Sequence, residues 1–195
     1  MKAFAENAPA AVSPWAALPA GGPPVRAALI GVSGYGRVHL NLLRELQARG
    51  ALHLTAAVII NQDKEAPVVA ELRAGGCRIH TDYQAMLVAE AGRLDLCCIP
   101  TGIPWHAPMT IAALLAGAHV LVEKPLAGSL AEVGAIRAAE RATGRWVAVG
   151  FQDVYQPQIA WLKQQLLDQS IGPMRSLRFV GMWPRSQAYF TRNDW

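Results

Sequence analysis

Short segments of strand length, most of them apolar, alternate with amphipathic, helix-like segments along most of the chain. The strand-length segments are residues 25–30, 52–60, 75–80, 94–100, 119–122 and 146–151. Between them, apolar residues three or four positions apart predict helices at about 37–49, 65–73, 83–90, 107–116 and 130–143. Strands that alternate with helices predict a parallel sheet with helices on both faces. We therefore expect an α/β fold with a doubly wound, mainly parallel sheet.

The same pattern predicts three regions along the chain. Residues 1–24 are rich in alanine and proline and predict a flexible tail, and residues 25–150 carry the alternating strands and helices. Residues 151–195 predict a linking helix at about 157–168 and a strand at 174–183 that opens a second, incomplete α/β domain. One long strand cannot bury its faces unaided. We therefore expect a truncated gene product or a fragment.

Composition and charge narrow the class of protein. Of the 195 residues, 52% are hydrophobic and 16% are charged, which suits a globular core. The formal net charge is +4, but the basic residues are scattered, so the charge suits an anionic cofactor better than a nucleic acid. The longest nearly apolar segment, residues 110–122, is too short to span a bilayer. Residues 1–24 lack the apolar stretch of a secretory signal.

The three cysteines, Cys77, Cys97 and Cys98, have neither the spacing of a zinc site nor the even number of a disulfide framework. Cys97 and Cys98 are adjacent on a predicted strand, so their side chains are expected on opposite faces of the sheet. We interpret all three as small apolar core residues of a cytoplasmic protein. We expect no metal site.

The first predicted strand leads directly into a glycine-rich turn. The order is G-x-S-G-x-G, with Gly31 and Gly36 at the outer positions, Ser33 and Gly34 between them, and a helix after them. In dinucleotide-binding folds, such glycines allow the tight bend, the close approach of the pyrophosphate and the packing of helix on strand. Glycine clusters also form ordinary turns. The flanking strand and helix favour a Rossmann dinucleotide site.

The end of the second predicted strand is where a dinucleotide-binding protein usually offers an acidic residue to the adenosine ribose. Ile59, Ile60 and Asn61 occupy this position here, with Asp63 slightly further along. Either Asn61 or Asp63 can reach a ribose from this loop, and a purely solvated loop is an equally good interpretation. No arginine lies at this position to bind the 2′-phosphate of NADP, so NAD is slightly favoured over NADP.

The carboxyl end of the fourth predicted strand leads into the segment TGIPWHAPM at 101–109, which we expect to form a loop. Open α/β sheets bind their ligands at the carboxyl ends of their strands. Thr101, Pro104 and His106 are therefore expected at the cofactor crevice.

A Glu-Lys-Pro triplet ends the fifth predicted strand. A lysine at the end of a buried strand is costly unless its charge is used, so Lys124 is a candidate proton donor. A lysine–proline bond has a reduced preference for trans, and a cis bond before Pro125 can direct the lysine into the crevice. The alternative interpretation is an ion pair between Glu123 and a neighbour.

Four motifs along the chain form a set, namely GVSGYGRVH at 31–39, TGIPWHAPM at 101–109, GAHVLVEKPLAGS at 117–129 and VGFQDVYQP at 149–157. In this order they resemble the N-terminal half of the Gfo/Idh/MocA oxidoreductases, which include glucose–fructose oxidoreductase and inositol dehydrogenase. The resemblance implies a Rossmann domain that binds NAD or NADP, followed by an α/β domain that carries the substrate site and mediates dimers or tetramers. It also implies hydride transfer between nicotinamide and a hydroxyl-bearing small molecule such as a sugar or cyclitol.

The resemblance implies a role for each matching residue. The pyrophosphate would be lined by Gly31, Ser33, Gly34, Tyr35 and Gly36. The rest of the cofactor would be bordered by Thr101, Pro104 and His106, and its nicotinamide by Glu123, Lys124 and Gln152. Lys124 is the catalytic candidate, because the family lysine contacts the substrate hydroxyl and assists proton transfer. His39 matches a recurrent family histidine, and packing alone is a sufficient explanation for it.

Two departures from the family pattern stand against activity. Residues 152–155 replace the family's arginine-containing segment, and the aspartate and histidine of a later catalytic helix have no counterpart, since the last histidine is His119. Most of the oligomerising sheet is also absent. The leading hypothesis is therefore an oxidoreductase of this family, inactive if truncated. The alternatives are a non-catalytic nucleotide-binding or interaction module, and an α/β domain whose glycine turn binds another phosphate ligand.

Overall fold

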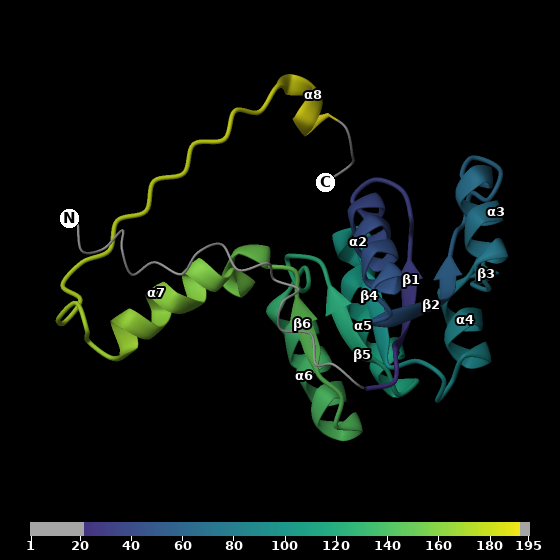
Figure 1. Cartoon of the computed structure of the whole chain (residues 1–195), viewed down its shortest axis with the longest axis horizontal. Helices are drawn as coiled ribbons and strands as arrows, with labels where there is room; N and C mark the ends of the chain where they lie inside the picture. The colour runs from purple at the N-terminus through teal and green to yellow at the C-terminus, as the bar shows by residue number, and fades with distance from the viewer. Residues whose placement is uncertain (1–21, 192–195) are drawn as a thin grey trace. The chain divides into compact units, whose positions relative to one another are not determined.

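The structure is a computed structural model that describes residues 22–191, so most of the tail predicted at 1–24 lies outside the described residues. Six parallel strands form one sheet in the order β3-β2-β1-β4-β5-β6 (Figure 1). The strands are β1 (Val25–Ile30), β2 (Leu52–Val58), β3 (Arg78–His80), β4 (Leu96–Ile99), β5 (His119–Val122) and β6 (Val147–Val149). The expected doubly wound α/β fold is confirmed, and each strand lies within its predicted segment.

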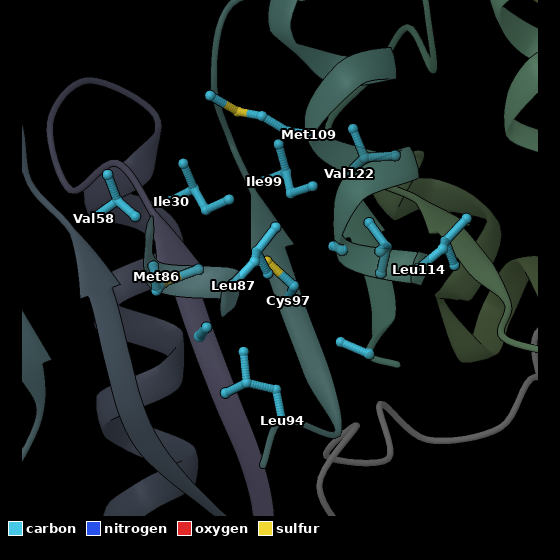
Figure 2. Close-up of a cluster of buried hydrophobic side chains, with 14 of the residues drawn as sticks. Ile30, Val58, Met86, Leu87, Leu94, Cys97, Ile99, Met109, Leu114 and Val122 are labelled. Atoms are coloured by element: carbon cyan, nitrogen blue, oxygen red, sulfur yellow. The ribbon is translucent and has the colours of Figure 1, made fainter. Parts of the chain in front are cut away.

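Helices cover both faces of this sheet because its strands are apolar on both sides. One core lies between the sheet and the helices α2 (Gly36–Ala48) and α3 (Ala66–Ala74). The other, drawn in Figure 2, lies between the sheet and the helices α4 (Tyr83–Ala89), α5 (Ile103–Leu115) and α6 (Leu130–Thr143). The helices that follow β1 and β4, which are neighbours in the sheet, therefore lie on opposite faces.

The cysteines behave as the sequence predicts. Cys97 belongs to the core beneath α5, and its neighbour Cys98 belongs to the opposite core. All three thiols are buried and free, and burial raises the pKa of Cys77 and of Cys98 to about 12. The interpretation as apolar core residues is confirmed.

Polar side chains cap two of the helices. Asp82 accepts a hydrogen bond from the backbone N–H of Ala85 at 2.7 Å and begins α4. Ser129 accepts one from the N–H of Glu132 and begins α6, and the Glu132 carboxylate accepts in turn from the N–H of Gly128. The Ser129–Glu132 bonds form a capping box whose return bond goes to Gly128, one residue before the cap.

Helix α5 begins four residues earlier than the sequence predicts. Residues 101–109 were expected as a loop, but the helix starts at Ile103 and includes Pro104 in its first turn. Proline lacks an N–H that the first turn does not need, and its fixed φ suits that position. The prediction of a loop is therefore wrong for most of this segment.

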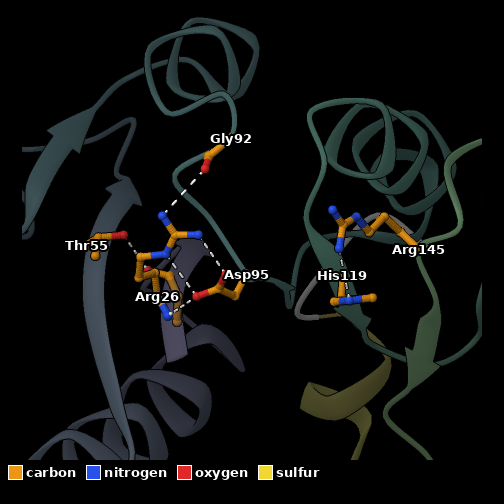
Figure 3. Close-up of polar contacts among 7 residues, drawn as sticks. Arg26, Thr55, Gly92, Asp95, His119 and Arg145 are labelled. Carbon is orange, nitrogen blue, oxygen red and sulfur yellow. Dashed lines mark hydrogen bonds and ion pairs between the residues drawn. The ribbon is translucent and has the colours of Figure 1, made fainter. Parts of the chain in front are cut away.

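The amino edge of the sheet is joined by an ion pair between the starts of β1 and β4. Arg26 Nη2 and Nε donate to the two carboxylate oxygens of Asp95 at 2.8 and 3.0 Å, and the Arg26 backbone N–H donates at 2.8 Å (Figure 3). Further along the same edge, the neutral ring of His119 accepts the backbone N–H of Trp146 at 3.1 Å. Burial, and then the charge of Arg145, lower the pKa of His119.

The described residues divide into two compact units, 22–153 and 154–191. The second unit contains the helices α7 (Pro157–Leu167) and α8 (Gln187–Phe190), and α7 agrees with the helix predicted at 157–168. Residues 172–186 form neither helix nor strand, so the strand predicted at 174–183 is not formed. A strand is defined by pairing, and no other strand within residues 22–191 pairs with this segment.

Residues 22–191 hold neither a candidate membrane-spanning helix nor a candidate metal cluster. No helix within residues 22–191 has both the length and the apolar character needed to cross a bilayer. Within the same range, no group of three or more His, Cys, Asp and Glu side chains is arranged to hold a metal ion.

A buried carboxylate joins α4 to β3. Glu90, directly after α4, is almost completely buried and accepts from Arg78 Nε and, at 2.5 Å, from Arg78 Nη2. The hydrogen bonds from the half-exposed Arg78 guanidinium lower the pKa of Glu90 below its ordinary value of 4.5. This pair supplies a charged link between α4 and β3, and His80 Nε2 lies 3.9 Å from the same carboxylate.

We expect Glu90→Gln to reduce the free energy of unfolding at pH 7 by about 1.5–3 kcal/mol, the range for a hydrogen bond to a charged group. Because the folded pKa is lowered, the wild-type contribution is complete above about pH 4.5 and is lost as pH falls through the folded value. Urea unfolding at pH 7 and below pH 4 measures this gap, which should close in acid. Glu45→Gln, on an exposed helix pair with Arg49, is the control. A gap that stays constant with pH contradicts the assignment.

Candidate functional site

The turn between β1 and α2 presents backbone N–H groups that have no partner among the described residues. Gly31 and Gly34 have φ values of +93° and +56°, which favour glycine. Gly36 has no room for a side chain, because a Cβ there would collide with the Gly31 carbonyl. Within residues 22–191, the N–H groups of Ser33, Gly34 and Tyr35 donate to no other protein group, and no side chain caps α2. Such a row of donors at a helix N-terminus suits an anion.

A cavity of about 400 Å³ opens beside this turn at the carboxyl ends of β1, β2 and β4. Most of its wall is apolar, and aromatic rings of Tyr83 and Trp105 meet edge to face at a centroid distance of 6.5 Å. Of the predicted cofactor residues, Gly31, Ser33, Asn61 and Thr101 line it. The remaining wall is made by Ile30, Val32, Val58, Ile59, Ile60, Lys64, Glu65, Thr81, Asp82, Tyr83, Trp105 and Met109. An apolar wall with a few polar groups is typical of a ligand site.

The charged groups on the cavity wall differ in their partners. The Glu65 carboxylate accepts from Arg37 Nη2 at 2.5 Å, and the Asp82 carboxylate caps α4. Lys64 is exposed and its ammonium has no ion-pair partner among the described residues. Asp63 lies with Lys64 on an adjoining shallow hollow. Among the three charged groups on the cavity wall, Lys64 is therefore the one most available to a ligand.

The Glu-Lys-Pro triplet directly follows β5. The bond between Lys124 and Pro125 is cis, as the sequence analysis considers. Glu123 is buried, and its Oε1 lies 3.0 Å from Nε2 of His39, a residue in the first turns of α2. The Oε2 atom accepts the backbone N–H of Lys124 at 3.3 Å. The structure thus brings the glycine turn and the triplet together through His39, as the ion-pair interpretation of Glu123 anticipates.

Lys124 itself is exposed, so the expectation that its ammonium is desolvated at the strand end is wrong for this structure. The buried member of the triplet is the carboxylate of Glu123. Lys124 lies two residues beyond the end of β5, outside the sheet whose two faces the helices cover. Lys124 keeps an ammonium that is open to solvent and to a ligand.

The three residues expected from 101–109 have different positions. Thr101 lines the cavity, and Pro104 is exposed in the first turn of α5. His106 is buried, with Nδ1 2.7 Å from the Pro125 carbonyl oxygen and Nε2 2.9 Å from the Thr101 carbonyl oxygen. The His106 ring therefore links the loop after β4 to the loop after β5.

Other predicted residues lie outside the cavity. Gln152 is exposed and begins a short 3-10 helix (Gln152–Tyr155) after β6. Tyr35 is exposed beside the glycine turn. Trp105 and Tyr83 were not predicted as site residues, although Trp105 belongs to the quoted TGIPWHAPM motif and Tyr83 follows the helix cap Asp82. The assignment of all these residues to a cofactor stays a prediction.

Two curated proteins are similar to this chain over most of its length. A dTDP-3,4-didehydro-2,6-dideoxy-alpha-D-glucose 3-reductase from Streptomyces antibioticus is 30% identical over 142 residues, which cover 73% of this chain and 43% of that protein. An inositol 2-dehydrogenase/D-chiro-inositol 3-dehydrogenase from Shouchella clausii is 32% identical over 157 residues, which cover 80% and 44%. The chain spans less than half the length of these relatives.

A solved structure and a family model indicate the same relationship as these two proteins. A 3-ketoreductase from Actinomadura kijaniata, in complex with NADP and TDP-benzene, matches with a TM-score of 0.60 and 26% identity over 74% of this chain and 42% of that one. Residues 25–151, more than half of the chain, match the model of an oxidoreductase family with an NAD-binding Rossmann fold. The predicted resemblance is thereby confirmed: the chain belongs to the Gfo/Idh/MocA family of oxidoreductases.

Proposed function

We propose that residues 25–150 bind NAD or NADP, and that the protein transfers hydride between the nicotinamide and a hydroxyl-bearing small molecule such as a sugar or cyclitol. The observation that supports this most directly is the row of N–H groups at Ser33, Gly34 and Tyr35, which have no partner within residues 22–191 and lie beside a ligand-sized cavity. The relatives named above act on sugars or an inositol. A cytoplasmic location is part of the proposal, and three free thiols support it.

The residues present fit a dinucleotide in three places. The N–H groups of the glycine turn suit a pyrophosphate, and the apolar wall with Tyr83 and Trp105 suits an adenine. The exposed ammonium of Lys124, at the end of β5, suits the reacting end of the site. When bound, the nicotinamide supplies the hydride chemistry. The contribution of the chain is to bind, to orient and, at Lys124 Nζ, to hold or release the proton of the substrate hydroxyl.

A nucleotide-binding module without turnover is the second candidate function. Within residues 22–191, Lys124 has no titratable partner in contact with its ammonium. A general acid usually works with a second group that relays its proton. This isolation of Lys124 favours a protein that holds the cofactor without catalysing its reaction.

Gly36→Ala is expected to weaken NADH binding about tenfold or more, equivalent to ~1.4 kcal/mol. The added Cβ would collide with the Gly31 carbonyl and displace the start of α2 from the turn. Titration of the purified chain, followed by nicotinamide fluorescence, measures the dissociation constant. Gly134→Ala, on α6 with nothing within 4 Å of its Cβ, is the matched control. Absence of saturable NADH and NADPH binding by the wild type up to millimolar concentration would overturn the proposed function.

The charges on the cavity wall support NADPH over NADH, in contrast to the slight preference for NAD that the missing arginine indicates. We expect Lys64→Ala to weaken NADPH binding about tenfold and NADH binding less than twofold, since only the 2′-phosphate needs the cation. Asp63→Asn should change the preference in the opposite direction, because it removes a repelling charge. Lys163→Ala, an exposed lysine on α7, is the control. Equal losses for both cofactors would exclude this role of Lys64.

Turnover distinguishes the two candidate functions. If the protein is an enzyme, the full chain should reduce NAD or NADP in the presence of a polyol, and Lys124→Ala should lower kcat about 10²-fold or more, the usual size of a general acid–base contribution. Because Lys124 is also expected at the nicotinamide end, NADH and NADPH affinity should fall as well, but by a smaller factor than kcat, about tenfold or less. Cofactor binding without turnover of any polyol, cyclitol or sugar tested would favour the non-catalytic module.

A further inference from the structure

A buried polar pair links two segments that are 84 positions apart in the sequence. Nε2 of His39 lies 3.0 Å from Oε1 of Glu123, and both side chains are buried, at 9% and 12% exposure. An ionised carboxylate only accepts hydrogen bonds, so the ring nitrogen donates. A buried hydrogen bond of this kind holds its partners in one geometry, because either group left alone pays a desolvation penalty.

The surroundings of the Glu123 carboxylate are built to accommodate it. Gly150, just after β6, would place a Cβ 2.5 Å from Oε1 and 2.9 Å from Cδ of Glu123, so any side chain there displaces the carboxylate. The φ of Gly150 is not in the left-handed region, and space is therefore the reason that the position suits glycine. The other member of the pair, His39, has an aromatic neighbour: the rings of Tyr35 and His39 meet edge to face, with their centroids 5.8 Å apart.

This pair touches both ends of the proposed cofactor site without lining the cavity itself. His39 stands in the helix that begins at the glycine turn, one turn after Gly36. Glu123 accepts the backbone N–H of Lys124 with its second oxygen. The carboxylate is thus hydrogen-bonded at once to the helix that carries the anion-binding turn and to the residue that carries the reactive ammonium.

We propose that His39 and Glu123 are positioning residues that fix the Lys124 turn relative to the glycine turn, so that a dinucleotide held at its pyrophosphate finds Lys124 at its nicotinamide end. The proposal rests on the proposed function, since it assumes a dinucleotide in this site. It gives the buried His39 a role beyond packing. It also assigns to Glu123 a role through the backbone of Lys124 rather than a direct contact with the nicotinamide.

Binding of ADP and of reduced cofactor to the full chain tests this proposal. ADP carries the adenosine and the pyrophosphate but no nicotinamide, so it reports on the glycine turn and the cavity alone. We expect His39→Leu to raise the dissociation constants of NADH and NADPH about tenfold, with that of ADP within twofold. His39→Gln, whose amide N–H can still donate to the carboxylate, should restore most of the loss. His53→Leu, an exposed histidine at the start of β2, is the control.

The outcomes distinguish a failure of the proposed function from a failure of the positioning role. If the wild type binds neither ADP nor reduced cofactor, the proposed function fails. If it binds both and His39→Leu weakens them equally, or if His39→Gln restores nothing, the pair is a general support of the fold and the positioning role is wrong. Thermal unfolding of each variant accompanies the titrations, since a stability loss without a change in the ratio of NADH to ADP affinity also contradicts the role.

A second variant tests the same geometry from β6. Gly150→Ala leaves His39 and Glu123 in the sequence but removes the space that the carboxylate occupies. It should reproduce the selective, about tenfold loss of reduced cofactor relative to ADP. Gly134→Ala supplies the matched control, because nothing lies within 4 Å of the added Cβ. Unchanged selectivity in Gly150→Ala would show that displacement of the Glu123 carboxylate has no effect on the nicotinamide end.

Discussion

The reversal of strand order between β1 and β4 is the constraint on which the candidate site depends. These neighbouring strands run parallel and end at the same edge of the sheet, but the helices that follow them lie on opposite faces. The backbone segments that follow these two strands leave the same edge of the sheet toward opposite faces. They cannot fill the space between them, so a crevice forms there. The glycine turn and Thr101 stand on its two sides, and the cavity opens there. The arrangement follows from backbone topology, before any side chain is considered.

Glycines give the backbone around this crevice its conformation and space, and buried carboxylates link its elements. Gly31 and Gly34 allow a backbone conformation that other residues rarely adopt, whereas Gly36 and Gly150 provide space, one for a carbonyl and the other for a carboxylate. The Glu123 carboxylate fills the space at Gly150 and reaches His39. Glu90 and Arg78 form a comparable link between α4 and β3. The two buried carboxylates, Glu90 and Glu123, therefore each have a specific partner that stabilises them, as the cost of desolvation requires.

The loops after β4 and β5 illustrate how one ring can hold a site together without entering it. His106 is buried and both of its nitrogens face backbone carbonyls, one in each loop. The triplet after β5 is consequently held from two sides, by His106 at Pro125 and by Glu123 at Lys124. Lys124 and Pro125 are both exposed, so the Lys124 ammonium is the charged group of the triplet that is left to solvent and to a ligand. A rigid base with one exposed functional group is the arrangement that a binding or catalytic site requires.

The sequence by itself determined the order of strands and helices, the glycine turn and the family, because hydrophobic periodicity, caps and positive φ are properties of neighbouring residues. It also determined that the side chains of Cys97 and Cys98 lie on opposite faces of the sheet. Only the tertiary structure decided that Tyr83 and Trp105 share a cavity wall, that Glu123 rather than Lys124 is buried, and that 174–183 forms no strand. Each of these depends on groups far apart in the chain, and no local pattern records whether such groups meet.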